Sequence, residues 1–144
     1  MAYIVNADIV LRVGDDATVQ LTADTGSSVD ATVLDEIRLS SEGEVNGYLA
    51  KRYAVPVDLS AHPDAAGTLK GFTLDLAVYR LHTRRAPANK DVQQMRDNAI
   101  EWLKGIAEGK INLPVAVTPA ATTADDPIVA WGSKEQNAAG MRDL

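Results

Sequence analysis

The longest helical pattern in the chain runs from Asp30 to Pro56, and it constrains the fold more than any other stretch. Asp30 suits a helix N-cap because its side chain can accept hydrogen bonds from free backbone N–H groups, and Pro56 cannot continue a helix. Lys51 and Arg52 place positive charge near the negative end of the helix dipole. The pattern predicts a helix of about 23 residues, roughly 35 Å long, along which the other segments must pack.

One face of this helix is expected to be buried, because its residues recur at spacings of three and four. They are Val33, Leu34, Ile37, Ser41, Val45, Tyr48, Leu49 and Arg52. Upstream, a short helix is predicted over residues 7–13, with Asn6 as its N-cap and Gly14 at its end, and residues 17–21 are expected to add a helical turn. Residues 3–5 form an apolar hook that packs either on its own core or on a neighbouring chain.

Two more helices are predicted downstream of the long one. Residues 57–66 are interpreted as a loop, followed by a helix over about 68–84 and another from Lys90 to a left-handed cap at Gly109. Their buried faces are Leu69, Phe72, Leu76, Ala77, Tyr79 and Leu81 in the first and Val92, Met95, Ala99, Trp102, Leu103 and Ile106 in the second. Trp102 at this spacing is expected in the core.

The fold class predicted from these patterns is mainly α. It is a small four- to five-helix bundle organised on one long helix over residues 1–113, with an extended C-terminal arm over residues 114–144. In the arm the composition shifts to Ala, Thr, Pro, Asp and Gly without a helical or strand period. An apolar island within it holds Ile128, Val129 and Trp131, which we interpret as a candidate contact with another chain.

The charge of this 144-residue chain is −6 overall but uneven along its length. Residues 1–64 hold eleven acidic and four basic side chains, whereas residues 65–113 hold five acidic and eight basic ones. The asymmetry has two readings. In the first, the charges are simply solvated and the asymmetry has no functional role. In the second, the subunit has an acidic face and a basic face, and these faces pack head to tail in a ring.

Positive charge concentrates at the end of the predicted 68–84 helix, in Arg80, Arg84 and Arg85. Cations there complement the helix dipole, which is the simplest interpretation. The alternative is that they contact either DNA or an acidic neighbouring subunit, in which case they are candidate subunit-interface residues. Because the subunit is acidic overall, we favour the neighbour.

No constellation in the sequence supports catalysis. The two His residues are isolated, and there is no glycine-rich phosphate loop and no serine nucleophile elbow. The absence of Cys excludes thiolate chemistry and disulfides. Asp24 begins an acidic turn, but counted as a calcium loop it places Gly26 and Val29 at positions that need an oxygen ligand and a glycine. We therefore expect no enzyme activity, no metal and no cofactor.

Three segments of the chain resemble a known family. They are residues 48–56 (YLAKRYAVP), 74–81 (LDLAVYRL) and 99–111 (AIEWLKGIAEGKI), and the opening residues 1–10 add a fourth. In this order and spacing they resemble the small neck proteins of Mu-like phages. The resemblance covers residues 1 to about 113, so the long tail after Leu113 is expected to lie outside the family core.

The resemblance implies a virion structural role, namely a head–tail connector, adaptor or head-completion protein. Proteins of this kind form a ring beneath the portal, commonly of twelve copies, and join the DNA-filled head to the tail. The implied partners are further copies of the chain, the portal protein, a tail-side neck or tail terminator protein, and genomic DNA that passes through the lumen without sequence recognition. The implied location is the head–tail junction of the virion, with the host cytoplasm during assembly.

A second function class remains open at the level of sequence. The chain can be a small helical nucleic-acid-binding regulator that acts as a monomer or dimer through the 68–84 helix. Such a protein needs a basic recognition surface, and the acidic flanks of this chain oppose one. No apolar run approaches the ~20 residues that a membrane-spanning helix needs, so no membrane partner is expected.

Overall fold

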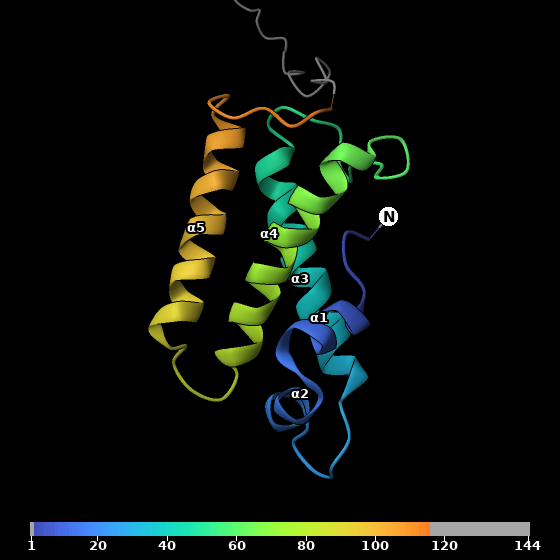
Figure 1. Cartoon of the computed structure of the whole chain (residues 1–144), viewed down its shortest axis with the longest axis vertical. Helices are drawn as coiled ribbons and strands as arrows, with labels where there is room; N and C mark the ends of the chain where they lie inside the picture. Colours follow the sequence, from blue (N-terminus) through green and yellow to red (C-terminus); the bar gives the residue numbers. More distant parts are fainter. Residues whose placement is uncertain (1, 116–144) are drawn as a thin grey trace, which may run out of the picture.

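The computed structural model describes residues 2–115, and within this range the protein folds into five helices without strands. Helices α3 (Ala31–Leu49), α4 (Pro63–His82) and α5 (Lys90–Ala107) form a bundle in which α4 runs antiparallel to α3 and α5. Helices α1 (Asn6–Val13) and α2 (Asp15–Thr22) pack against α3 and α4 and make no comparable contact with α5 (Figure 1). The predicted class, a mainly α bundle of four to five helices, is confirmed.

Helix ends are set by local chemistry, mostly at the predicted residues. The Asp30 side chain accepts from the backbone N–H groups of Thr32 and Val33 at 3.0 and 3.3 Å, which confirms it as the N-cap of α3. Gly14 and Gly109 have φ angles of 99° and 84°, in the region that favours glycine. Both therefore end helices as expected.

The predicted N-cap of α1 is wrong by one residue. Val5 occupies the cap position, and its N–H donates to the carboxylate of Asp8 at 2.9 Å. The Asn6 side chain instead donates to Asp35 at 2.7 Å and accepts from Arg38 at 3.3 Å, which ties α1 to α3. The Asn6 side chain therefore makes a tertiary contact with α3 instead of the predicted capping hydrogen bond.

Helix α3 is shorter than predicted, because it ends at Leu49 rather than close to Pro56. Residues 50–53 form a turn in which the N–H groups of Arg52 and Tyr53 both donate to the carbonyl of Leu49. The turn directs the Tyr53 ring into the core, where it is 1% exposed. Burial of this aromatic ring and the hydrogen bonds described below offset the loss of a further helical turn.

Helix α4 begins five residues earlier than predicted, so the expected loop over residues 57–66 ends at His62. Pro63 is the first helical residue, where its missing N–H costs no hydrogen bond and its fixed φ suits the helix. Residues of the extra turn join the core, and Ala65 is fully buried. Proline here starts a helix, whereas the sequence pattern alone suggested a break.

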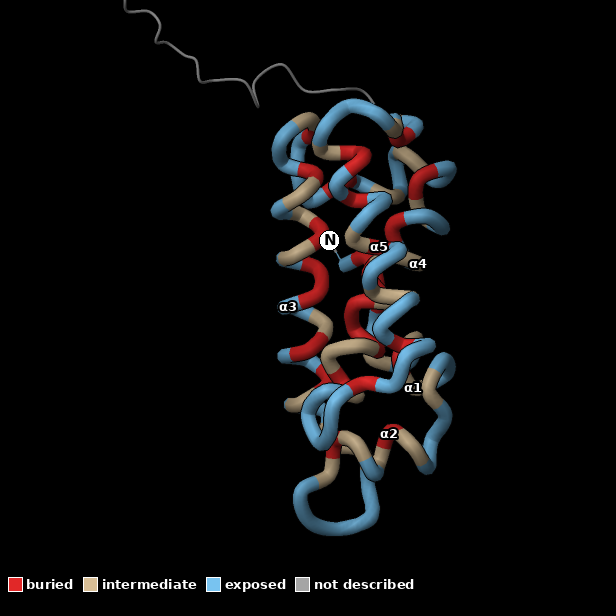
Figure 2. Tube along the Cα trace, turned by 90° about the vertical axis from the view of Figure 1, so that its left-hand side faces the viewer, coloured by how far each residue is buried: buried red, intermediate tan, exposed pale blue. Residues whose placement is uncertain are grey.

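The core runs along the bundle in two main clusters that share α4 (Figure 2). One lies among α3, α4, α5 and the connecting loops and contains Tyr3, Val45, Leu49, Tyr53, Leu69, Leu103 and Ile106. The other lies beneath α1 and contains Ile4, Ile9, Leu34, Ile37, Ala77 and Leu81. The prediction that Trp102 is a core residue is wrong, because it is 51% exposed, although its ring lies near that of Phe72, with ring centroids 6.1 Å apart.

Candidate assembly surfaces

The N-terminal hook is held by a carboxylate that the sequence analysis did not single out. Glu42, buried on α3, accepts from the backbone N–H groups of Tyr3 and Ile4 at 2.5 and 3.2 Å and from the Arg38 guanidinium at 3.3 Å. The Tyr3 hydroxyl donates to Asn46 and accepts from the N–H of Val57. The hook was expected to pack either on its own core or on a neighbouring chain. In the structure, Tyr3 and Ile4 pack in the core of their own chain.

Burial raises the pKa of the Tyr3 hydroxyl above its ordinary value, against the opposing effect of the hydrogen bond from Val57. This hydroxyl therefore stays neutral and can serve as donor and acceptor at once. The hook, α3 and the segment after it form one hydrogen-bonded unit. Tyr3 and Ile4 are therefore part of the scaffold, whereas the Val5 side chain is 55% exposed.

The segment after α5 is fixed to the segment after α3 by Arg52. Its guanidinium donates to the carbonyls of Ile106 and Ile111 at 3.1 and 3.2 Å and to the Asn112 side chain at 2.8 Å. Next to it, the Tyr53 hydroxyl accepts from the N–H of Leu113 at 3.0 Å. Arg52 was predicted to complement the dipole of its own helix, but in the structure its charge lies at the C-terminus of α5.

Two of the three predicted interface arginines bind the C-terminus of α2 and the start of the loop between α2 and α3. Arg84 donates to the carbonyls of Leu21 and Thr22, and Arg85 donates to the carbonyl of Ala23 at 2.6 Å. Both guanidiniums also pair with the Asp24 carboxylate, at 3.5 and 3.1 Å. The acidic group that these cations contact in the described structure therefore belongs to the same chain.

Arg80, the third predicted arginine, also has a partner in its own chain. Its guanidinium pairs with Glu44 of α3 at 2.7 Å, and it lines a hollow with Tyr79 and Arg96. The Arg96 guanidinium lies 5.1 Å from the centre of the Tyr79 ring, which is cation–π geometry. All three predicted arginines remain partly exposed, so their role in a subunit interface stays a prediction.

The other predicted interface residues, Ile128, Val129 and Trp131, lie outside the described residues, as does nearly all of the predicted arm over residues 114–144. Within residues 2–115, large apolar side chains are exposed on three different helices. They are Leu11 on α1, 86% exposed, Leu39 on α3, 60% exposed, and Trp102 on α5. Exposed apolar side chains of this size mark surfaces that a partner can cover.

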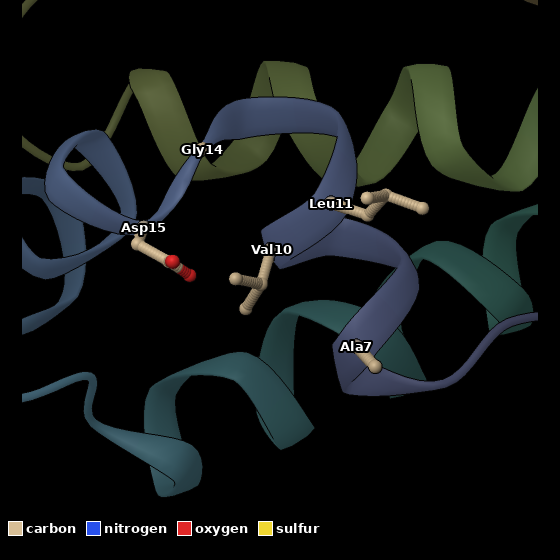
Figure 3. A pocket seen from close by; sticks show the side chains of 5 residues that line it. All are labelled: Ala7, Val10, Leu11, Gly14 and Asp15. Atoms are coloured by element: carbon tan, nitrogen blue, oxygen red, sulfur yellow. The ribbon is translucent and has the colours of Figure 1, made fainter.

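Leu11 stands between two hollows on the outer side of α1. Ala7, Val10, Gly14 and Asp15 line the first with it, a space of about 440 Å³ in which Val10 and Asp15 point toward one another (Figure 3). The second, of about 330 Å³, is lined by Leu11, Asp8, Arg12, Lys70 and Leu74. The combination offers a projecting leucine with depressions on either side of it.

Neither a metal centre nor a membrane span is found in the described part of the chain. Residues 2–115 contain no group of three or more His, Cys, Asp and Glu side chains arranged to hold an ion, and none of their helices is long and apolar enough to cross a bilayer. In the loop that the calcium test considered, Asp24 binds arginines and Asp30 caps α3. Both carboxylates thus have structural partners.

A small helical subunit with apolar side chains on several surfaces is typical of a protein that works within an assembly. Residues 3–130 match the family described as Bacteriophage Mu, Gp36, and the chain belongs to this family. It is therefore a protein of a Mu-like phage. No curated protein matches the chain. The match continues to residue 130, so the expectation that the family ends near Leu113 is wrong.

Proposed function

We propose that this phage protein is a head–tail connector, a structural subunit that forms a ring beneath the portal and joins the DNA-filled head to the tail. The observation that carries the proposal is the family match, because residues 3–130 belong to a Mu phage family. The neck-protein resemblance of residues 48–56, 74–81 and 99–111 supplies the specific role.

The arrangement of the subunit supports this role. Its scaffold is closed by hydrogen bonds that Glu42 and Tyr53 accept and Arg52 donates. Leu11, Leu39 and Trp102 remain exposed on three separate helices. A ring subunit needs two different contact surfaces for its neighbours and further surfaces for the components above and below it. The distribution of exposed apolar groups on α1, α3 and α5 suits that requirement.

The partners that we propose are further copies of the chain in a ring of about twelve, the portal on one side and a tail-side neck or terminator protein on the other. Genomic DNA passes through the lumen without sequence recognition. The site of action is the head–tail junction of the virion, reached after assembly in the host cytoplasm. No catalytic step is part of the proposed role.

The arginines weigh against the alternative of a nucleic-acid-binding regulator. Such a protein needs cations that are free to contact phosphates. In the described structure Arg80 pairs with Glu44, and Arg84 and Arg85 share Asp24 and three backbone carbonyls. Binding of DNA through these side chains would have to break contacts that hold the α2–α3 loop.

The experiment that tests the proposal is deletion of the gene followed by inspection of the particles. We expect filled or partly filled heads that do not join tails, and separate finished tails, with joining restored when the full chain is supplied. Particles that join normally without the chain would contradict the connector role. Failure of head formation itself would point to a capsid function instead.

A further inference from the structure

The strongest feature without an assigned role is a pair of apolar surfaces, the Leu11 surface and the Leu39 surface. The Leu11 surface consists of Ala7, Leu11, Arg12 and Gly14 on α1 and Lys70 on α4. The Leu39 surface consists of Glu36, Leu39, Gly43 and Gly47 on α3. In Figure 2, α3 lies along the left edge of the molecule and α1 lies toward the right, so the two helices occupy different sides of the subunit.

The two surfaces are complementary in shape. On the Leu11 surface a leucine projects between two hollows. On the Leu39 surface a leucine projects beside Gly43, and a Cβ added to Gly43 or to Gly47 would meet nothing within 4 Å. The leucine of the Leu39 surface can therefore lie in a hollow beside Leu11, while the side-chain-free face at Gly43 and Gly47 lets the helix that carries Leu11 approach α3 closely.

The glycines of α3 are unexplained by packing within the chain. A glycine in the middle of a helix costs roughly 0.5–1 kcal/mol relative to alanine. Gly43 and Gly47 both have helical dihedrals and open space around them, so neither a turn nor a close neighbour in the same chain requires them. A flat helix surface without side chains allows another chain to approach closely.

The two surfaces are also complementary in charge. In the two ion pairs beside Leu11 the cations are the more exposed partners, since the Lys70 side chain is 48% exposed and its partner Asp8 only 19%, and Arg12 is likewise more exposed than its partner Asp75. The exposed Asp15 adds one carboxylate at the first hollow. In the ion pair next to the Leu39 surface the order is reversed, because Asp35, which also accepts from Asn6 of its own α1, is 53% exposed and its partner Arg38 only 20%. Glu36 next to Asp35 is exposed as well.

We propose that the Leu11 surface of one copy of this chain binds the Leu39 surface of the next copy, so that α1 and α4 of one subunit pack on the outer side of α3 of its neighbour. Because the two surfaces differ, the contact is head to tail, and repetition closes a ring or continues as a filament. The inference rests on the proposed function, and it names the contact that would build the ring.

The absence of Cys from the chain allows a cross-linking test without background. The full chain is prepared with Leu11→Cys, with Leu39→Cys and with both substitutions, and is treated with a short bismaleimide in phage particles and as concentrated purified protein. Both leucines are exposed, so the substitutions should leave the fold intact. We expect the double variant to give a ladder of dimers, trimers and larger species on a denaturing gel, and each single variant to remain monomeric.

A matched control combines Leu39→Cys with Gln94→Cys, which places the second thiol on the exposed side of α5. This pair should give no ladder. Dimers from Leu39→Cys alone would overturn the proposal, because they indicate a symmetric contact of two α3 helices. A double variant that gives no ladder in either preparation would also overturn it.

The experiment distinguishes failure of the proposed contact from failure of the proposed connector role. A ring at the neck that does not cross-link would leave the connector role standing and reject the contact. A ladder in purified protein, together with particles that lack the chain, would retain the contact and reject the connector role. As a second measurement, Leu39→Asp should raise the concentration needed for association about tenfold or more, whereas Gln94→Asp should leave it unchanged.

Discussion

The two ends of the bundle are closed by different chemistry. At the end where α3 and α5 finish, Arg52, Tyr53 and Tyr3 make hydrogen bonds that are largely buried and join segments more than fifty residues apart. At the other end, Arg84 and Arg85 hold the α2–α3 loop through Asp24, whose side chain is 66% exposed. Buried hydrogen bonds resist solvent competition and exposed ion pairs do not, so the first end should be the more stable one.

This difference assigns a role to each region. The hydrogen-bonded end and the hook around Glu42 form a scaffold, in which few groups remain for a partner. The α1–α2 end keeps its large apolar side chain, Leu11, at the surface and depends on exposed charges for its loop. We therefore expect substitutions to affect stability most in the scaffold and assembly most at α1 and α3.

The largest loss of stability is expected from Glu42→Ala. The substitution removes the acceptor of two N–H groups, those of Tyr3 and Ile4, which are buried with it, and should lower the free energy of unfolding by about 3 kcal/mol. Chemical denaturation followed by tryptophan fluorescence measures it. Glu36→Ala, at an exposed position of the same helix, is the control and should change stability by less than ~0.5 kcal/mol. Equal losses of unfolding free energy in the two variants would show that the buried hydrogen bonds of Glu42 do not stabilise the protein.

A smaller loss, about 2 kcal/mol, is expected from Arg52→Ala, because the carbonyls of Ile106 and Ile111 lose a charged donor. Lys51→Ala, at the exposed neighbouring position, should be close to neutral. Hydrogen exchange should show faster opening of residues 106–113 in the Arg52 variant only. Unchanged exchange there would show that Arg52 does not fix the end of α5.

The join between α1 and the bundle should respond to acid through Asp8. The N–H of Val5 is the main cause that lowers the pKa of this carboxyl, and Lys70 adds to it. A carboxyl with a lowered folded-state pKa stabilises the protein above its unfolded pKa of about 3.9 and loses that contribution as the pH falls through the folded value.

Asp8→Asn should therefore cost about 1 kcal/mol near neutral pH, and the difference from the unmodified protein should shrink below about pH 4. Urea denaturation at a series of pH values gives this difference directly. A difference that stays constant down to pH 2 would show that the charge of Asp8 is not responsible.

The smallest effect is expected at the exposed end. Asp24→Ala should cost less than ~1 kcal/mol, because Arg84 and Arg85 keep their backbone carbonyl acceptors, and the cost should fall as salt is added. Thermal unfolding at low and high ionic strength measures it. A loss as large as that of Glu42→Ala would reverse the ranking of the two ends.

Features that depend on residues close in sequence could be predicted from the sequence alone. The spacing of Leu34, Ile37, Val45 and Leu49 is periodic within one helix, so the buried face of α3 could be predicted, as could the caps at Asp30 and Gly109. The burial of Glu42 could also have been predicted from its position in the helix. It lies three residues before Val45 and seven before Leu49, on the side that is buried.

What could not be predicted depends on distant partners. Asn6 and Arg52 follow local rules for caps and dipoles, yet their side chains bind residues 29 and 54 or more positions away. Trp102 has core spacing, but it is 51% exposed beside Phe72 of α4. The surfaces on α1 and α3 were also missed, because Leu11 and Leu39 are recognised as exposed only when the packing of their helices is known.

In the proposed role, copies of this Mu-family protein form the ring that connects head and tail. Imaging of purified particle necks, with native mass spectrometry of the released complex, tests it most directly. We predict a ring of about twelve copies of the chain between the portal and the tail. A neck without this chain, or the chain located only in the capsid shell or the tail tube, would contradict the account.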